Sequence, residues 1–237
     1  ILLLMTSENS ISPIIEDRIY FLSKRGEYEH IKALYEEGDV YINSIDYIRK
    51  CDNNQDRSDR EDGIFFREFI GDAKITLCDI NKDLDKDGIT FNSKDVVFNN
   101  DHEMKGNIYC LTGIYSEHLS GERKDITFDV TSLGKSIILI HNPQEFLNRL
   151  FKALKENGYL NFKSSKVIYY NNDYTGHVGF FKKHDRFKPQ NEYRIFVQNS
   201  KNEPIKIKIG SLKDIASFNS GFLQLKYEDG IEQIITL

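Results

Sequence analysis

The sequence predicts an α+β fold, in which mixed, mainly antiparallel sheets are flanked by two or three helices. Short runs rich in aromatic and β-branched residues outnumber helical patterns along the 237 residues, and the 16 Phe and 13 Tyr favour strands. Clear helical spacing with capping signals is found at 27–38 and 143–158. With four prolines and no Ser/Gly tract, residues 1–237 are expected to form one compact domain, with 1–17 as an irregular N-terminal segment.

The chain begins with a strand–helix–strand pattern. A strand is expected at 18–24, a helix at 27–38 and a second strand that begins within 39–48. Apolar residues recur at helical spacing in the helix, and Gly38 is a typical C-terminal stop because glycine accepts the left-handed conformation found there. Ser44 is therefore expected on the second strand.

Four short apolar runs lie in the middle of the chain. The runs at 64–70 and 73–80 are expected to pair as two strands joined near Gly71. The runs at 89–91 and 95–100 are expected to form another short hairpin. This part of the chain therefore predicts two small hairpins.

The clearest helix lies at 143–158. Asn142 stands at its N-cap, Pro143 in its first turn and Glu145 three residues after the cap. Its apolar residues form one stripe, which is expected to face the core. Further strands are expected at 106–115, 136–142, 165–170 and 191–198.

Composition and charge narrow the class of protein. The net charge is −5 and the pI is about 5.7, which argues against the basic surface of a dedicated nucleic-acid-binding protein. The three cysteines lack CxxC spacing, and without a secretion signal their odd number indicates reduced thiols in the cytoplasm. No apolar run approaches the length of a transmembrane helix, so no membrane partner is expected.

Motifs for metal and nucleotide chemistry are absent or incomplete in the sequence. Residues 83–88 match the opening of a calcium-binding EF-hand loop, but Lys94 stands where that loop needs a bidentate glutamate, which favours a solvated turn. The six histidines have no HxxxH spacing. The sequence lacks a Walker loop, a GxGxxG after a strand and a GxSxG elbow. P-loop NTPases, common dehydrogenases and α/β-hydrolases are therefore excluded, and no metal is expected.

Two charged segments are candidates for a binding surface. Residues 56–63 mix acids with arginines, which fits either a solvated loop or a substrate-facing loop in which Arg57 meets phosphate. Residues 180–196 interleave aromatic and cationic side chains, which suits a nucleotide because rings stack on the base and cations meet phosphate. The alternative for the second segment is an ordinary edge strand with Arg194 paired to Glu192.

One predicted strand face is polar where a half-buried strand prefers apolar groups. Gln190, Glu192 and Arg194 are expected to project from one surface, because side chains two apart on a strand point the same way. The apolar side chains between them project from the other surface. Such a polar face either meets solvent or presents a catalytic carboxylate to a cleft.

The order of several segments resembles the ADP-ribosyltransferase superfamily. The matching pieces are a first strand ("RIYFLSK"), a helix that ends in glycine ("EYEHIKALYEEG"), a second strand with serine ("YINS") and a late strand that opens with Gln-x-Glu ("QNE"). The segments "YINSIDYIR", "RSDREDG", "NIYCLTGIY" and "FKPQNEYRI" also look like bacterial proteins of toxin–antitoxin and phage-defence loci. These matches cover a small part of the chain.

The resemblance implies an ADP-ribosyltransferase-like fold that takes NAD as its substrate and needs no metal. Glu192 would hydrogen-bond the nicotinamide ribose and stabilise an oxocarbenium-like state as nicotinamide leaves. Gln190 would orient the acceptor, and Ser44 would position Glu192 or the ribose.

The resemblance also implies an NAD-binding set. The family commonly has Arg or His on its first strand, often directly after a tyrosine, whereas Tyr20 is followed here by Phe21. Arg18 shares the strand face of Tyr20 and would supply the charge. Arg57 and Arg194 would complete the set.

The predicted function is ADP-ribosyl transfer by a cytoplasmic bacterial effector of toxin or phage-defence type. Its acceptor would be a protein or a nucleic acid, and its partner an antitoxin or chaperone. Two alternatives remain open. One is a non-catalytic binding or inhibitor protein of similar fold. The other is a metal-dependent nuclease that gathers carboxylates around Mg²⁺. The candidate ligands of that nuclease are Asp56, Asp59, Glu61 and Glu192.

Overall fold

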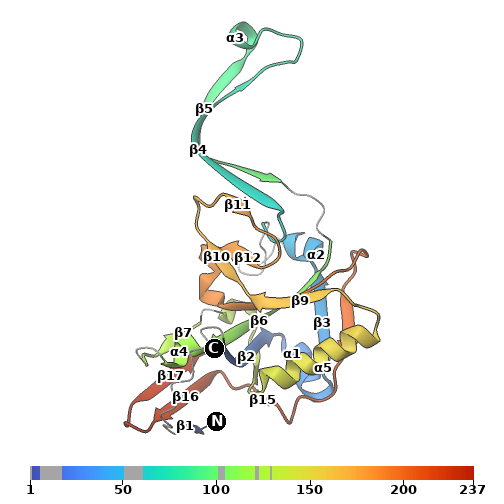
Figure 1. Cartoon of the computed structure of the whole chain (residues 1–237), viewed down its shortest axis with the longest axis vertical. Helices are drawn as coiled ribbons and strands as arrows, with labels where there is room; N and C mark the ends of the chain where they lie inside the picture. The colour runs from blue at the N-terminus through green and yellow to red at the C-terminus, as the bar shows by residue number, and fades with distance from the viewer. Residues whose placement is uncertain (1, 6–17, 51–60, 101–104, 121–122, 129) are drawn as a thin grey trace.

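The fold consists of a central sheet with helices, a smaller sheet beside it and a long two-stranded arm that extends away from both (Figure 1). Figure 1 shows a computed structural model, which describes residues 2–5, 18–50, 61–100, 105–120, 123–128 and 130–237. Helices and strands are mixed and most strand pairs are antiparallel, which confirms the predicted α+β class. Within these ranges, no helix combines the length and the apolar composition that crossing a membrane requires.

The central sheet is built from antiparallel neighbours. Its order is β14 (Ile205–Lys208), β3 (Asp39–Ser44), β6 (Asn107–Tyr115), β2 (Ile19–Gly26), β8 (Ser136–Ile140) and β15 (Ala216–Phe218). Two further strands, β13 (Glu192–Val197) and β9 (Phe162–Lys166), join it because β13 pairs with both β6 and β9. Strand β13 is therefore an inner strand rather than an edge.

Smaller sheets and short helices complete the described structure. A four-stranded sheet contains β1 (Leu2–Met5), β16 (Phe222–Tyr227), β17 (Glu232–Thr236) and β7 (Ile126–Thr127). The other strands are β10 (Ile168–Tyr170) with β12 (Lys182–His184), and β11 (Gly176–His177) with β4 (Phe66–Leu77) and β5 (Ile89–Asn100). The helices are α1 (Tyr28–Glu37), α2 (Ile45–Lys50), α3 (Leu84–Asp87), α4 (Ser116–Ser120) and α5 (Pro143–Glu156), and the 3-10 helices are η1 (Thr131–Leu133) and η2 (Asp185–Gln190).

The two longer helices begin and end where local chemistry directs. The side chain of Asn142 accepts a hydrogen bond from the backbone N–H of Glu145 at 3.1 Å, which caps α5. Helix α1 ends at Gly38, whose φ of 73° is left-handed and costs glycine little. Both features confirm the predictions made from the sequence.

The main core lies between the central sheet and these helices. Tyr193, Ile195 and Val197 of β13 are buried there against the apolar stripe of α5, which includes Phe146 and Leu150. Complete burial of one such side chain stabilises the fold by roughly 1.5–3 kcal/mol. The side chains of β13 that alternate with these three therefore project from the opposite face of the sheet.

A second apolar cluster covers part of that opposite face. Phe21, Ile114 and Leu139 of the central sheet pack there against Leu225 and Ile235 of the four-stranded sheet. This cluster occupies the β2–β8 side of the sheet. The β13 side is covered by charged side chains instead.

The predicted pairing in the middle of the chain is wrong. The runs at 64–70 and 73–80 do not pair with each other; they belong to the single strand β4, whose register shifts on either side of Gly71. With a φ of 77°, Gly71 forms a bulge rather than a turn. The two runs expected to form a hairpin within 89–100 are likewise one strand, β5, with Asp95 at a φ of 50° opposite the bulge region.

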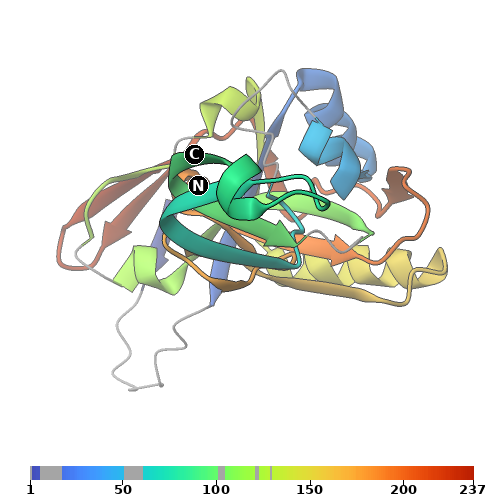
Figure 2. The ribbon, with the colours of Figure 1, turned by 90° about the horizontal axis from the view of Figure 1, so that it is seen from above.

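The resulting β4–β5 ribbon forms the arm. Strand β11 pairs with β4 only at Phe66 and Arg67, and beyond them β4 pairs with β5 alone. The arm carries the short helix α3 at its tip and extends away from the rest of the protein (Figure 1). In Figure 2, which looks down from the tip, the ribbon lies in front of the central sheet.

Candidate functional site

Strand β13 presents two charged side chains on one face. Glu192 pairs with Thr112 and Arg194 with Cys110 of β6, so both project from the face opposite the helices. Asn191, directly before the strand, is left-handed with a φ of 42° and separates β13 from η2. The strand at this position and the shared face of Glu192 and Arg194 confirm the sequence analysis.

Four buried charged side chains, Asp62, Lys183, Glu192 and Arg194, form what we call the ion network. Glu192 Oε1 accepts a hydrogen bond from Arg194 Nε at 2.6 Å, and Glu192 Oε2 accepts one from Lys183 Nζ at 3.1 Å. Arg194 Nη1 donates to Asp62 Oδ1 at 2.8 Å. Arg194 is 0% exposed and Glu192 is 3% exposed. Two cations therefore neutralise two carboxylates inside the protein, as buried charges require.

The ion network joins segments that are far apart in the sequence. Arg194 Nη1 also donates to the carbonyl of Phe180 at 2.8 Å, and the Phe180 ring stacks on Phe196 with centroids 3.7 Å apart. Lys183 Nζ donates to Gln190 Oε1 at 3.1 Å. These contacts fix the chain between β11 and η2 onto the face of β13.

The network holds its members in their charged forms. Burial by itself would raise the pKa of Glu192, but Arg194 and Lys183 lower that pKa well below its usual range. Burial would lower the pKa of Lys183 and Arg194, yet the two carboxylates raise both above their usual values. Burial, reinforced by Glu192, raises the pKa of the Cys110 thiol to about 12, so this neighbour stays protonated at neutral pH.

The burial and hydrogen bonds of Glu192 suit a structural role. Both of its carboxylate oxygens accept hydrogen bonds from the network, and the side chain is enclosed. The polar face of β13 was expected to meet solvent or a cleft, and for Glu192 and Arg194 both expectations are wrong. The reason is that Asp62 and Lys183 arrive from other segments and cover the face with opposite charge.

Gln190 lies near Glu192 but not on its strand. It is the last residue of η2, so the prediction that it shares the face of β13 is wrong. The left-handed turn at Asn191 interrupts the strand spacing on which that prediction depended. Gln190 and Glu192 nevertheless meet the same ammonium group, that of Lys183.

Ser44 is not brought to Glu192. Its hydroxyl accepts a hydrogen bond from the backbone N–H of Tyr47 at 3.2 Å, which caps the start of α2. Ser44 pairs with Asn107 of β6, whereas Glu192 pairs with Thr112 of the same strand. The two positions are five residues apart along β6, roughly 16 Å at about 3.3 Å per residue, and point to opposite faces.

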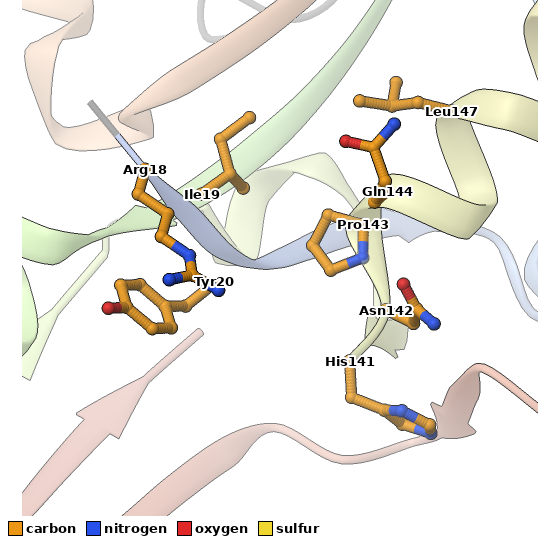
Figure 3. A pocket seen from close by; sticks show the side chains of 8 residues that line it. All are labelled: Arg18, Ile19, Tyr20, His141, Asn142, Pro143, Gln144 and Leu147. Atoms are coloured by element: carbon orange, nitrogen blue, oxygen red, sulfur yellow. The ribbon is translucent and has the colours of Figure 1, made fainter. Parts of the chain in front are cut away.

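Arg18 and Tyr20 line a hollow at the start of β2 (Figure 3). The hollow has a volume of about 590 Å³ and lies between β2 and the N-terminus of α5. The Arg18 guanidinium lies over the Tyr20 ring, 5.2 Å from its centroid. The lining residues are Arg18, Ile19, Tyr20, His141, Asn142, Pro143, Gln144 and Leu147.

The charged loop is described only from Glu61 onward, and that part contributes Asp62 to the ion network. Arg57, Asp56 and Asp59 lie outside the residues that the structure describes. Glu61 is described, and its Oε2 accepts a hydrogen bond from the hydroxyl of Tyr170 at 2.6 Å. Among the described residues, no three His, Cys, Asp or Glu side chains are grouped so that they could hold a metal ion.

Two members of the ion network were missed as site residues. Asp62 and Lys183 were visible in charged segments, but their partners depend on tertiary contacts between distant parts of the chain. The sequence carries a partial signal: charged side chains on an inner strand need further polar partners, and the charged segment of Lys183 lies close by in the sequence. Asp62 lies 132 residues from Arg194, so no local pattern points to it.

The outer half of the arm has one apolar and one polar face. Ile75 pairs with Phe91 and Leu77 with Ile89, so these side chains share a face with that of Ala73. We call Ala73, Ile75, Leu77, Ile89 and Phe91 the apolar arm face, which Ser93, the partner of Ala73, borders. The opposite face, which we call the polar arm face, carries Lys74, Thr76, Thr90 and Asn92.

The apolar arm face is largely uncovered. Ile89 is 73% exposed, Leu77 60% and Phe91 43%. On the polar arm face, the hydroxyls of Thr76 and Thr90 lie 2.8 Å apart, which suits a solvent-facing cross-strand pair. The arm therefore has the alternation of a sheet that covers a core, but no described part of this chain supplies that core.

Comparison with known proteins identifies no family for this chain. The chain matches none of the family models, curated proteins and solved structures with which it was compared. The features that bear on function are therefore the ion network, the hollow and the arm.

Proposed function

We propose that this protein acts by binding another protein surface through the apolar arm face. This is the non-catalytic alternative that the sequence left open. The observation that carries the proposal is the one-sided exposure of Leu77, Ile89 and Phe91 on a ribbon that extends from the fold. Contiguous exposed apolar surface of this kind is typical of interaction sites.

The ribbon also needs a partner for its own stability. An isolated two-stranded ribbon is marginally stable in water, and beyond Arg67 neither arm strand has a third strand beside it among the described residues. Free strand edges and an uncovered apolar face are both liabilities that proteins usually avoid. A partner that covers the face removes the cost of the exposed apolar surface.

The ion network supports this proposal indirectly. A catalytic carboxylate must reach its substrate, whereas the oxygens of Glu192 are engaged by Arg194 and Lys183. The network is better suited to holding the segments at the base of the arm, because Asp62 lies four residues before β4. Its proposed role is to anchor the arm.

Photo-crosslinking in the cells that produce the protein tests the binding function. A photoreactive residue is placed at Phe91, on the apolar arm face, and in a matched variant at Asn92, on the polar arm face. We expect a discrete protein adduct from position 91 and little from position 92. Equal yields at both positions, or no adduct at either, would overturn the proposal.

A second candidate function is ADP-ribosyl transfer with NAD, in an ADP-ribosyltransferase-like fold. One observation favours it: Arg18 and Tyr20, both assigned to NAD from the sequence, line the same hollow. Arg18 offers a cation for phosphate, Tyr20 a ring for a base, and the start of α5 a positive helix end. A volume of about 590 Å³ lies within the range of small-molecule sites.

Labelled NAD separates the two functions. If the second candidate holds, the protein transfers label to a protein or nucleic-acid acceptor in lysate, and Arg18→Ala abolishes transfer without unfolding the exposed start of β2. An antitoxin or chaperone partner of such an enzyme would co-purify with the protein from the cells that produce it. Calorimetry that detects no NAD binding by the wild type would exclude this candidate and leave the binding function untouched.

A further inference from the structure

We infer that the partner of the apolar arm face is the same face of a second copy of this chain. This inference rests on the proposed binding function and names its partner. It commits to face-to-face packing of two arms related by a two-fold axis. Each arm would cover the apolar side chains that the other leaves exposed.

The face is complementary to itself. Its five side chains are uncharged, and Lys74 lies on the opposite side of the ribbon. Two identical faces can therefore meet without burying an unpaired charge, which would oppose association. A closed two-fold contact uses the same patch on both copies, and most soluble oligomers form in this way.

The arrangement of side chains allows two arms to interdigitate. The cross-strand pairs Ile75–Phe91 and Leu77–Ile89 form two adjacent apolar rows on each ribbon. Sheets that pack face to face lie about 10 Å apart, with the side chains of their inner faces between them. In such a pair the polar arm faces, with Thr76 and Thr90, remain in water.

The size of the arm suits a modest dimer. Strands β4 and β5 have 12 residues each, so the ribbon is roughly 40 Å long at about 3.3 Å per residue. The apolar arm face covers only residues 73–77 and the part of β5 paired with them, roughly 16 Å of that length, so with two strands about 4.8 Å apart its footprint is roughly 160 Å² before protruding side chains enlarge the buried area. A standard interface buries about 800 Å² per partner, so the dimer should dissociate on dilution.

The charge of the arm argues against a strongly charged partner. Acids and lysines are interspersed around the tip and the bulge, as in Asp79, Lys82, Asp95 and Lys94, without a block of one sign. A partner recognised by charge would need such a block. Apolar self-association needs none.

The test is the molar mass of the purified full-length chain across a concentration series, measured by sedimentation. The wild type should rise from the 27.6 kDa of one chain towards twice that value. Ile89→Lys should remain a monomer at every concentration, because it puts a charge in the packed face. Thr90→Lys, its neighbour on the polar arm face, should dimerise like the wild type, and equal far-ultraviolet spectra confirm that both variants fold.

The possible results distinguish the dimer inference from the proposed binding function on which it rests. A wild type that stays monomeric overturns the dimer inference. A crosslinked adduct from position 91 with a different protein would then still support the proposed binding function. The absence of any adduct would contradict the dimer inference and the binding function together. Loss of dimer in Thr90→Lys as well as Ile89→Lys would also overturn the dimer inference, because the contact would then not be specific to the apolar arm face.

Discussion

The face of β13 that carries Glu192 and Arg194 and the apolar arm face both reverse the usual distribution of side chains between the protein interior and the solvent. On β13, Glu192 and Arg194 are buried among further charges. On the arm, Leu77 and Ile89 are exposed to solvent. Both are strands with alternating faces, so backbone geometry does not distinguish them. The difference is whether the chain itself supplies matching partners.

The comparison shows that burial follows partners rather than residue type. The ion network is neutral, because Asp62 and Lys183 complete the charges of β13, and among its buried polar atoms Arg194 Nη2 is left without a hydrogen-bond partner. The apolar arm face has no such complement among the described residues. Buried charge and exposed apolar surface are the informative exceptions in a folded protein, and here they are the observations behind the proposed anchor and the proposed binding face.

The largest expected effect comes from breaking the ion network at Arg194. Arg194→Leu leaves Glu192 and Asp62 as buried carboxylates without their shared cation. We expect the free energy of unfolding to fall by about 3–5 kcal/mol, measured by urea denaturation. Arg149→Leu is the matched control, because Arg149 pairs with Glu145 and Asp214 on a partly exposed surface, and at no more than about 1 kcal/mol for each pair it should cost no more than about 2 kcal/mol. Equal losses would refute the structural role.

A double-mutant cycle on Lys183 and Glu192 measures how strongly these two members of the ion network are coupled. Lys183→Met and Glu192→Gln should each lower the free energy of unfolding by about 3 kcal/mol, because each leaves a buried partner incompletely neutralised. The double variant should lose less than the sum of the single losses, by about 1–3 kcal/mol. Strict additivity in denaturation experiments would show that the 3.1 Å contact is not energetically coupled.

Acid should weaken the network through Glu192. Burial raises the pKa of this carboxyl, but Arg194 and Lys183 outweigh burial and lower it. A lowered folded-state pKa means that its contribution is complete above the unfolded value of about 4.3 and is lost as the pH falls below it. The stability difference between the wild type and Glu192→Gln, followed by urea unfolding, should therefore shrink below about pH 4. A constant difference down to pH 3 would contradict this account.

The smallest expected effect on stability comes from the arm. Ile89→Thr changes a side chain that is 73% exposed, so the free energy of unfolding of the monomer should change by less than about 0.5 kcal/mol. Denaturation at low protein concentration measures this change. A loss of more than about 2 kcal/mol would mean that the arm face is covered within one chain.

Local patterns predicted the parts of the fold that depend on neighbours in sequence. The cap at Asn142 and the stop at Gly38 follow from side chains within four residues of each other or from one glycine. The first part of the arm is predicted as a hairpin because a glycine such as Gly71 fits a turn as well as a bulge. Only the pairing of β4 with β5 decides between these structures.

The candidate site was less predictable because it depends on register and tertiary contact. The resemblance stated from the sequence implies that Ser44 lies near Glu192, whereas the register along β6 separates the two residues. Arg18 and Tyr20 do lie together at the hollow. No local signal stated that Asp62 would reach Arg194 across the fold.

Amide hydrogen exchange compares the two regions most directly. In dilute protein, the amides of β13 should exchange slowly, as in the stable core, and those of β4 and β5 beyond the Gly71 bulge should exchange fast. Raising the protein concentration should slow the arm amides and leave β13 unchanged. Arm amides as slow as those of β13 in dilute protein would contradict the account, because the arm would then be stable without a partner.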